Sequence, residues 1–227
     1  MVSTTSHAVR SGNGCHHDVL EAGPPATRQV DARLDREGVA GHERRGVALH
    51  DVGVLVGLDA DADGYADEGY GHGTFVSGIA ALVAPDARIL PLRVLDAEGR
   101  GNVFVVAEAI YDAVDAGADV INLSFGTADK LKSAVLQDAV RAAEKGGAVV
   151  VGSAGNDGSQ DAHYPAAMAG VSSVAAQAEN ATALATFSAR GAWVDIAAPG
   201  EHVVSTLPCG YGSWSGTSMA APFVSGM

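Results

Sequence analysis

One serine in this sequence lies in a run of mostly small residues, 216–222, which reads GTSMAAP. The run predicts a loop-to-helix junction, where Gly216 allows close approach of the backbone. A helix N-terminus also offers unpaired N–H groups and a partial positive charge. A nucleophile in acyl transfer needs such a place, because substrate must reach it and the oxyanion that forms beside it must be stabilised. On its own a GTS tripeptide indicates a helix N-cap, so Ser218 becomes a candidate nucleophile only if partners accompany it.

Two other residues are candidate partners. His72 lies between two glycines in the run 71–74, GHGT, at the predicted start of a helix. From there it could share a proton with a hydroxyl, as a general base must. Asn156 lies in the run 153–158, SAGNDG, directly after a predicted buried strand, and parallel sheets carry their sites at the carboxyl ends of strands. Its amide could donate to an oxyanion. Alone, the histidine would be a capping or surface residue and the asparagine a turn residue.

The elements that must position these residues alternate along the chain. Pro85 ends the helix that begins near His72, Asn102 is the predicted N-cap of a second helix that Gly117 ends, and Gly146-Gly147 ends a third. The rhythm predicts a doubly wound, mainly parallel α/β sheet with helices on both faces. The expected strands are 47–49, 52–58, 87–95, 120–123, 148–152, 173–176, 193–197 and 203–206, and the expected helices are 72–83, 103–114 and 130–145.

Charge and composition exclude several classes of partner. The chain has 227 residues, enough for one sizeable domain, and a formal net charge of −13. The first fifty residues hold six Arg against six Asp and Glu, so the acidic excess lies entirely in residues 51–227. An acidic body repels phosphate, which argues against nucleic acid and anionic membranes as partners. No apolar run is long enough for a membrane span, and oligomeric state is left open.

The N-terminal part of the chain differs from the rest. It holds five of the eight histidines and lacks an apolar period of 2 or 3.6 residues. We predict that residues 1–46 form an atypical segment, disordered or foreign to the domain, and that residues 47–227 form the domain. Cys15 and Cys209 could form one bridge, but two small apolar side chains explain them better. The first residues lack the cationic and apolar regions of a secretory signal.

Several motifs in a fixed order resemble one family. The runs GHGT (71–74), SAGN (153–156) and GTSMAAP (216–222) are similar to the histidine, oxyanion asparagine and serine blocks of the subtilisin-like serine peptidases, the subtilases of peptidase family S8. Connecting segments resemble the family too, and the resemblance covers about residues 52–227. These segments are NLSFG at 122–126, YPA at 164–166 and AAPG at 197–200.

The resemblance implies a fold and an activity. It implies a subtilisin-like serine endopeptidase that hydrolyses polypeptide substrates through an acyl-enzyme, with Ser218 as nucleophile, His72 as general base and Asn156 as oxyanion donor. It also implies that no cofactor is required for the chemistry, and it favours an extracellular location. The segments that would flank the bound peptide have mostly small side chains, which suit an open slot for the substrate side chain, and are Ser124, Phe125, Gly126, Ser153, Ala154 and Gly155.

The aspartate that orients the histidine is the weakest block. Asp51 follows a β-prone run and precedes Gly53 by two residues, as the family aspartate does, so it is our candidate. The intervening residue is Val52, however, and Asp51 precedes His72 by 72 − 51 = 21 positions, fewer than is usual in the family. In a second alignment, residues 54–59 match the segment after the aspartate block, and the block itself is missing. Both alignments remain open.

Two further expectations concern the end of the chain and a metal. Met227 follows Ser218 by nine residues, whereas family members continue well beyond the serine, so we expect a domain truncated at its C-terminus and uncertain activity of this fragment. The carboxylates of Asp59, Asp61 and Asp63 alternate before Gly64, as at the opening of a calcium loop. The twelfth position lacks the closing glutamate. A structural Ca²⁺ is therefore one reading and a solvated acidic loop the other.

Two rival functions are kept beside the peptidase. A catalytically inactive remnant would keep the scaffold and bind peptides, and the doubtful aspartate favours it. A sedolisin-type acid peptidase would share a GTS serine but use acidic residues in place of the histidine, and the GHGT run argues against it. Labelling with a fluorophosphonate separates a working serine site from a remnant.

Overall fold

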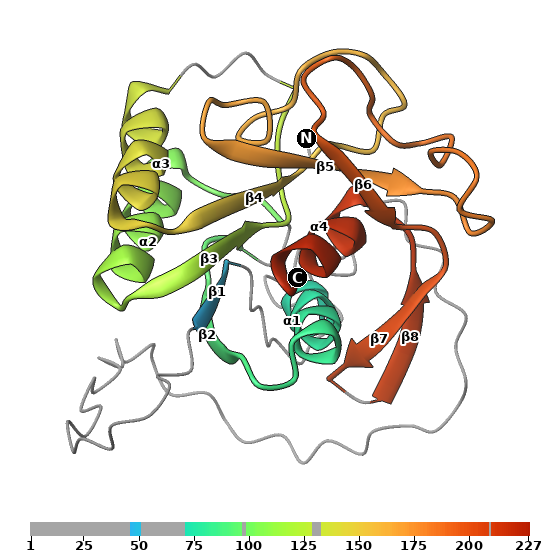
Figure 1. Cartoon of the computed structure of the whole chain (residues 1–227), viewed down its shortest axis with the longest axis horizontal. Helices are drawn as coiled ribbons and strands as arrows, with labels where there is room; N and C mark the ends of the chain where they lie inside the picture. The colour runs from blue at the N-terminus through green and yellow to red at the C-terminus, as the bar shows by residue number, and fades with distance from the viewer. Residues whose placement is uncertain (1–45, 51–70, 97–98, 129–132, 209) are drawn as a thin grey trace, which may run out of the picture. The chain divides into compact units, whose positions relative to one another are not determined.

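The computed structural model describes residues 46–50, 71–96, 99–128, 133–208 and 210–227, with the backbone alone for 46–50 (Figure 1). All of them belong to one compact unit of the chain, and a second unit, Ser11–Glu43, lies outside them. The predictions for Asp51, the acidic run 59–63, the strand 52–58, the segment 1–46 apart from Gly46, and both cysteines also fall outside the described residues.

A parallel sheet of six strands forms the centre of the described unit. Its order is β2-β1-β3-β4-β5-β6, and every neighbouring pair is parallel. The chain runs from β1 outward to β2, then returns past β1 to β3 and continues outward to β6, so the winding reverses beside β1. The strands are β1 (Gly46–His50), β2 (Arg88–Leu92), β3 (Ala118–Leu123), β4 (Val149–Ser153), β5 (Val171–Gln177) and β6 (Ile196–Pro199).

Four helices and a hairpin complete the described unit. Figure 1 shows α2 and α3 together on one face of the sheet and α1 and α4 on the other. The sheet and its helices confirm the predicted α/β class. The helices are α1 (His72–Val83), α2 (Val103–Asp115), α3 (Ala134–Gly146) and α4 (Thr217–Ser225), and the antiparallel hairpin is β7 (Val203–Leu207) with β8 (Gly210–Trp214).

Local signals explain where α2 and α3 begin and end. Asn102 accepts a hydrogen bond from Phe104 N–H at 2.8 Å, so the predicted N-cap is confirmed. Helix α3 begins later than predicted, because Ser133 is extended and its hydroxyl accepts from Leu136 N–H. At its C-terminus Gly147 adopts a left-handed conformation, which ends the helix as predicted.

Two strand predictions need correction. Strand β2 ends at Leu92 and not at residue 95; Pro91 is tolerated in it because it lies on the edge strand. Strand β6 begins at Ile196 and not at Trp193. The preceding residues form a turn that is bound to Ser173 of β5. Ser173 Oγ donates to the Trp193 carbonyl at 2.6 Å, and Ser173 N–H donates to the Asp195 carboxylate at 2.9 Å. Hairpin strand β8 was not predicted, because its sequence, GYGSW, has no apolar alternation.

The core has two parts, one on each face of the sheet. On the α2–α3 face, Ile110, Ile121 and Val140 are fully buried. On the other face, small residues of α4 such as Ala220 and Ala221 pack against Val174 of β5, so α4 lies close to the sheet. The close approach brings the start of α4 to the carboxyl ends of the strands.

Among the described residues no helix is long and apolar enough to cross a bilayer.

Candidate active site

Helix α4 carries Ser218 in its first turn. Gly216 is its N-cap residue and makes no side-chain cap, so the first N–H groups of α4 need other partners. Ser218 itself is 6% exposed, and its hydroxyl donates to the Ser124 carbonyl at 2.9 Å. Since that carbonyl follows β3 directly, the serine lies at the carboxyl edge of the sheet beside the reversal of the winding, where ligands bind in open α/β sheets.

The predicted oxyanion donor is held by the residue before the serine. Thr217 donates to Asn156 Oδ1 twice, from its N–H at 2.8 Å and from its hydroxyl at 2.9 Å. A backbone N–H can only donate, which fixes the carboxamide with its oxygen toward Thr217 and its Nδ2 group away from it. The hydroxyl of Thr217 also accepts from Gly155 N–H at 3.0 Å. The asparagine amide is therefore left oriented to donate to a third group.

That amide faces the loop before Ser218. A Cβ atom on Gly216 would lie 3.3 Å from Asn156 Nδ2, which places the amide next to the serine loop. The N-terminus of α4 contributes a partial positive charge at the same point. Both favour negative charge there, as an oxyanion site requires.

His72 begins α1 and is 7% exposed. Gly71 before it has φ of 76°, in the left-handed region that favours glycine, and a Cβ there would approach Leu207 and Pro208 to 3.0 and 3.1 Å. The imidazole stacks on Trp214 with 6.3 Å between ring centroids. The glycine and the indole together fix where the ring lies.

Helices α1 and α4 pack against each other. Phe75 and Ile79 of α1 share an apolar cluster with Met219, the residue after Ser218. The structure thus brings the histidine helix and the serine helix into contact. The hydroxyl proton of Ser218 is donated to the Ser124 carbonyl, so proton transfer to the imidazole requires the hydroxyl to turn away from that carbonyl.

The two predicted substrate segments also converge. Ser124, Phe125, Ser153 and Ala154 are all buried. A Cβ on Gly126 would lie 3.9 Å from the Ser153 carbonyl oxygen, so the two segments lie side by side. Binding of a peptide between them stays a prediction.

A third segment, which the sequence analysis named only as a run that resembles the family, joins these two. Thr127 and Tyr164 exchange backbone hydrogen bonds of 2.9 Å, and the ring of His163 lies against Gly155, where a Cβ would approach it to 2.6 Å. The ring therefore occupies space beside the predicted substrate slot. A histidine one residue before the YPA run was the available signal.

His163 is paired with an acid. Its Nε2 lies 3.0 Å from Asp157 Oδ2, next to the candidate oxyanion asparagine. Burial alone would raise the pKa of Asp157, but hydrogen bonds from Ser159 N–H, His163 and the Ser159 hydroxyl, and the charge of the imidazole, lower it below its ordinary value of 3.8. Asp157 is therefore held ionised beside the site.

Four acidic residues were predicted to contribute here, one as the candidate triad aspartate and three as candidate calcium ligands. Asp51, Asp59, Asp61 and Asp63 lie outside the described residues, although β1 ends at His50, at the same sheet edge as Leu123. Within the part of the chain that the structure describes, no group of three or more His, Cys, Asp or Glu residues could hold a metal ion.

The fold and this site define a doubly wound α/β protein with a serine and a histidine at the starts of two packed helices. The chain belongs to the Subtilase family, whose sequence profile matches residues 57–227. It is 43% identical to thermitase of Thermoactinomyces vulgaris over 77% of this chain and 66% of that protein. It is 37% identical to a thermophilic serine proteinase of Bacillus sp. strain AK1 over 97% of this chain and 59% of that protein.

Solved structures agree with this assignment. Proteases from Pseudoalteromonas arctica superimpose with a TM-score of 0.72 and 28% identity, over 80% of this chain and 75% of that one. A lanthipeptide protease gives a TM-score of 0.66 and 28% identity, over 80% and 71%. The chain spans 59% and 66% of the length of the first two curated relatives it matches.

Proposed function

We propose that this chain is the catalytic part of a serine endopeptidase that cleaves polypeptides through an acyl-enzyme. One observation carries the proposal: Thr217 holds the Asn156 carboxamide so that its Nδ2 group faces the loop before Ser218. Family membership and the relatives named as proteinases support it.

The proposed reaction uses three residues. His72 takes the proton of Ser218 Oγ, which attacks the peptide carbonyl and forms a C–O bond. The carbonyl oxygen becomes an oxyanion that accepts from Asn156 Nδ2, and the imidazolium then protonates the leaving amine as the C–N bond breaks. In the second half of the reaction His72 takes a proton from water, which attacks the acyl carbonyl. The imidazolium then protonates Ser218 Oγ as the ester C–O bond breaks. Asp51 stays our candidate for the group that orients the imidazole.

The inactive peptide-binding remnant is the second candidate, because the aspartate block departs from the family pattern. A fluorophosphonate separates the two, since it phosphonylates an activated serine. We expect labelling of the parent chain and none of Ser218→Ala. Ser188→Ala, which changes another buried serine, is the matched control and should label like the parent. A folded parent chain that takes no label would support the remnant.

Two finer expectations belong with this proposal. Ca²⁺ would bind at Asp59, Asp61 and Asp63, and an extracellular location would follow the family. Replacing calcium in the buffer with a chelator should lower the melting temperature of the parent chain but not that of Asp61→Asn. Equal melting temperatures with and without calcium in the parent would contradict it.

A further inference from the structure

A buried chain of polar side chains links the end of β3 to α4, and the proposed chemistry does not use it. Asn122, Ser124 and Ser225 are 0%, 1% and 4% exposed. Asn122 Nδ2 donates to the Ser124 hydroxyl at 2.8 Å, and the Ser225 hydroxyl donates to Asn122 Oδ1 at 2.9 Å. The Ser124 hydroxyl in turn donates to the carbonyl of Ser218 at 2.9 Å.

The last of these bonds replaces one that α4 cannot make. In a regular helix the Ser218 carbonyl would accept from the N–H of residue 222, four positions later. That residue is Pro222, which has no N–H and whose ring crowds the same carbonyl. Ser124 supplies a donor in place of the missing one. A buried carbonyl without a partner would be costly, so this compensation is a specific requirement of the site.

Through this hydrogen-bonded network, Asn122 contacts both ends of α4. Ser218 and Ser225 are seven positions apart and therefore lie on nearly the same face of the helix. Asn122 accepts from the later serine and donates toward the earlier one through Ser124. The contact near the nucleophile is also reciprocal, because Ser218 Oγ donates to the Ser124 carbonyl. Movement of Ser124 would therefore move both the backbone and the hydroxyl of Ser218.

We propose that Asn122 and Ser225 are positioning residues, which act through Ser124 to compensate for Pro222 and to fix the orientation of Ser218. The effect on turnover rests on the proposed function. The compensation for Pro222 does not, since it concerns folding alone. The two parts are therefore tested separately.

Thermal unfolding of four full-length chains tests the compensation: the parent, Ser124→Ala, Pro222→Ala and the double variant. Ser124→Ala should lower the melting temperature by about 3–6 °C, because it removes a buried hydrogen bond and orphans a carbonyl. In the Pro222→Ala background a helical N–H is available again, so the same change should cost at most half as much. Equal losses in both backgrounds would overturn the compensation.

Turnover of a chromogenic peptide tests the positioning. Ser225→Ala and Asn122→Ala should lower kcat by about tenfold with KM and the pH profile unchanged. Ser188→Ala is the control. The Ser188 hydroxyl accepts from Ala176 N–H and takes no part in this network, so its loss should lower the melting temperature without changing kcat.

The outcomes separate the two proposals. Unchanged kcat in folded Ser225→Ala and Asn122→Ala would overturn the positioning role. A parent chain with no turnover would count against the proposed function, and the rate of fluorophosphonate labelling or the unfolding cycle would then decide the inference.

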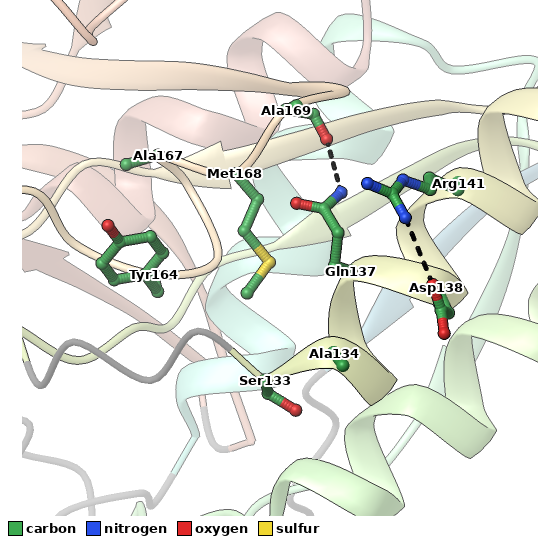
Figure 2. Close-up of a pocket in the computed structure, with 9 residues that line it drawn as sticks. All are labelled: Ser133, Ala134, Gln137, Asp138, Arg141, Tyr164, Ala167, Met168 and Ala169. Carbon is green, nitrogen blue, oxygen red and sulfur yellow. Dashed lines mark hydrogen bonds and ion pairs between the residues drawn. The ribbon is translucent and has the colours of Figure 1, made fainter.

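A separate cavity lies beside α3. It has a volume of about 420 Å³ and lies between the start of α3 and the loop after Tyr164. Figure 2 shows Tyr164, Met168 and Gln137 around it, with Gln137 donating to the Ala169 carbonyl.

Discussion

The helices that carry the two candidate catalytic side chains begin in different surroundings. The start of α1 contacts the antiparallel hairpin: Phe75 stacks on Trp214 at 4.7 Å, and the Ser205 hydroxyl donates to the Phe75 carbonyl at 2.7 Å. The start of α4 contacts the loops after the parallel strands instead: Thr217 N–H donates to Asn156 Oδ1, and the Ser124 hydroxyl donates to the Ser218 carbonyl.

The difference suggests different sensitivities. One contact of the His72 ring is its stacking on Trp214, and aromatic packing weakens gradually as contact area is lost. The serine is held by individual buried hydrogen bonds, in which the loss of one atom leaves a partner unsatisfied. We therefore expect mutations around Ser218 to change rate sharply and mutations around His72 to change rate and stability together.

The largest effect should come from removing both reacting groups, which tests whether the two helices act as one unit. His72→Ala and Ser218→Ala should each lower kcat by about 10⁶, the loss established for the corresponding residues of subtilisin. The double variant should be no slower than either single variant. If the two reductions in kcat multiply in the double variant, the two side chains work independently.

The next effect should come from the oxyanion donor. Asn156→Ala should lower kcat by about 10²–10³, the value established for the oxyanion donor of subtilisin, with little change in KM. Steady-state kinetics on a peptide substrate measure this. Asn180→Ala, in a turn where the side chain caps Thr182, is the matched control and should keep its activity. A similar loss in both variants would argue against a specific role.

A smaller effect should come from the packing around the histidine. Trp214→Ala should lower the free energy of unfolding by about 2 kcal/mol and kcat by about tenfold, because the indole contacts both His72 and Phe75. Trp214→Phe keeps an aromatic ring and should restore most of both. Urea unfolding and kcat on the same samples measure the two quantities. A rate loss without a stability loss would remove the contrast between α1 and α4.

The smallest effect concerns pH. The fold lowers the pKa of Asp157, so its carboxylate contributes stability above the ordinary value of 3.8, and this contribution is lost as the pH falls through the lower folded pKa. Asp157→Asn should therefore melt below the parent at pH 6, and the gap should close at lower pH. Melting temperatures across that range measure it. A gap that stays constant with pH would contradict the pKa shift.

Much of the fold could be predicted because its signals are local. Asn102 and Gly147 mark helix ends through their own side chain or conformation, and α1 and α2 occur where the periodicity placed them. The boundaries at Ser133 and Ile196 were wrong. In the second case the strand is delayed by hydrogen bonds from Ser173, twenty or more positions away, which no local window contains.

The candidate site divides in the same way. The sequence alone determined the family and the three candidate residues Ser218, His72 and Asn156. The backbone close to a reacting group requires small residues, so each candidate lies in a short motif that can be recognised in the sequence. Only the tertiary structure decided which neighbours hold them. Asn122 and Ser225 are 103 positions apart, and Pro222 gives no sign in the sequence that Ser124 compensates for it. Hydrogen bonds between distant segments depend on how the sheet and helices pack, and packing is a property of the whole fold.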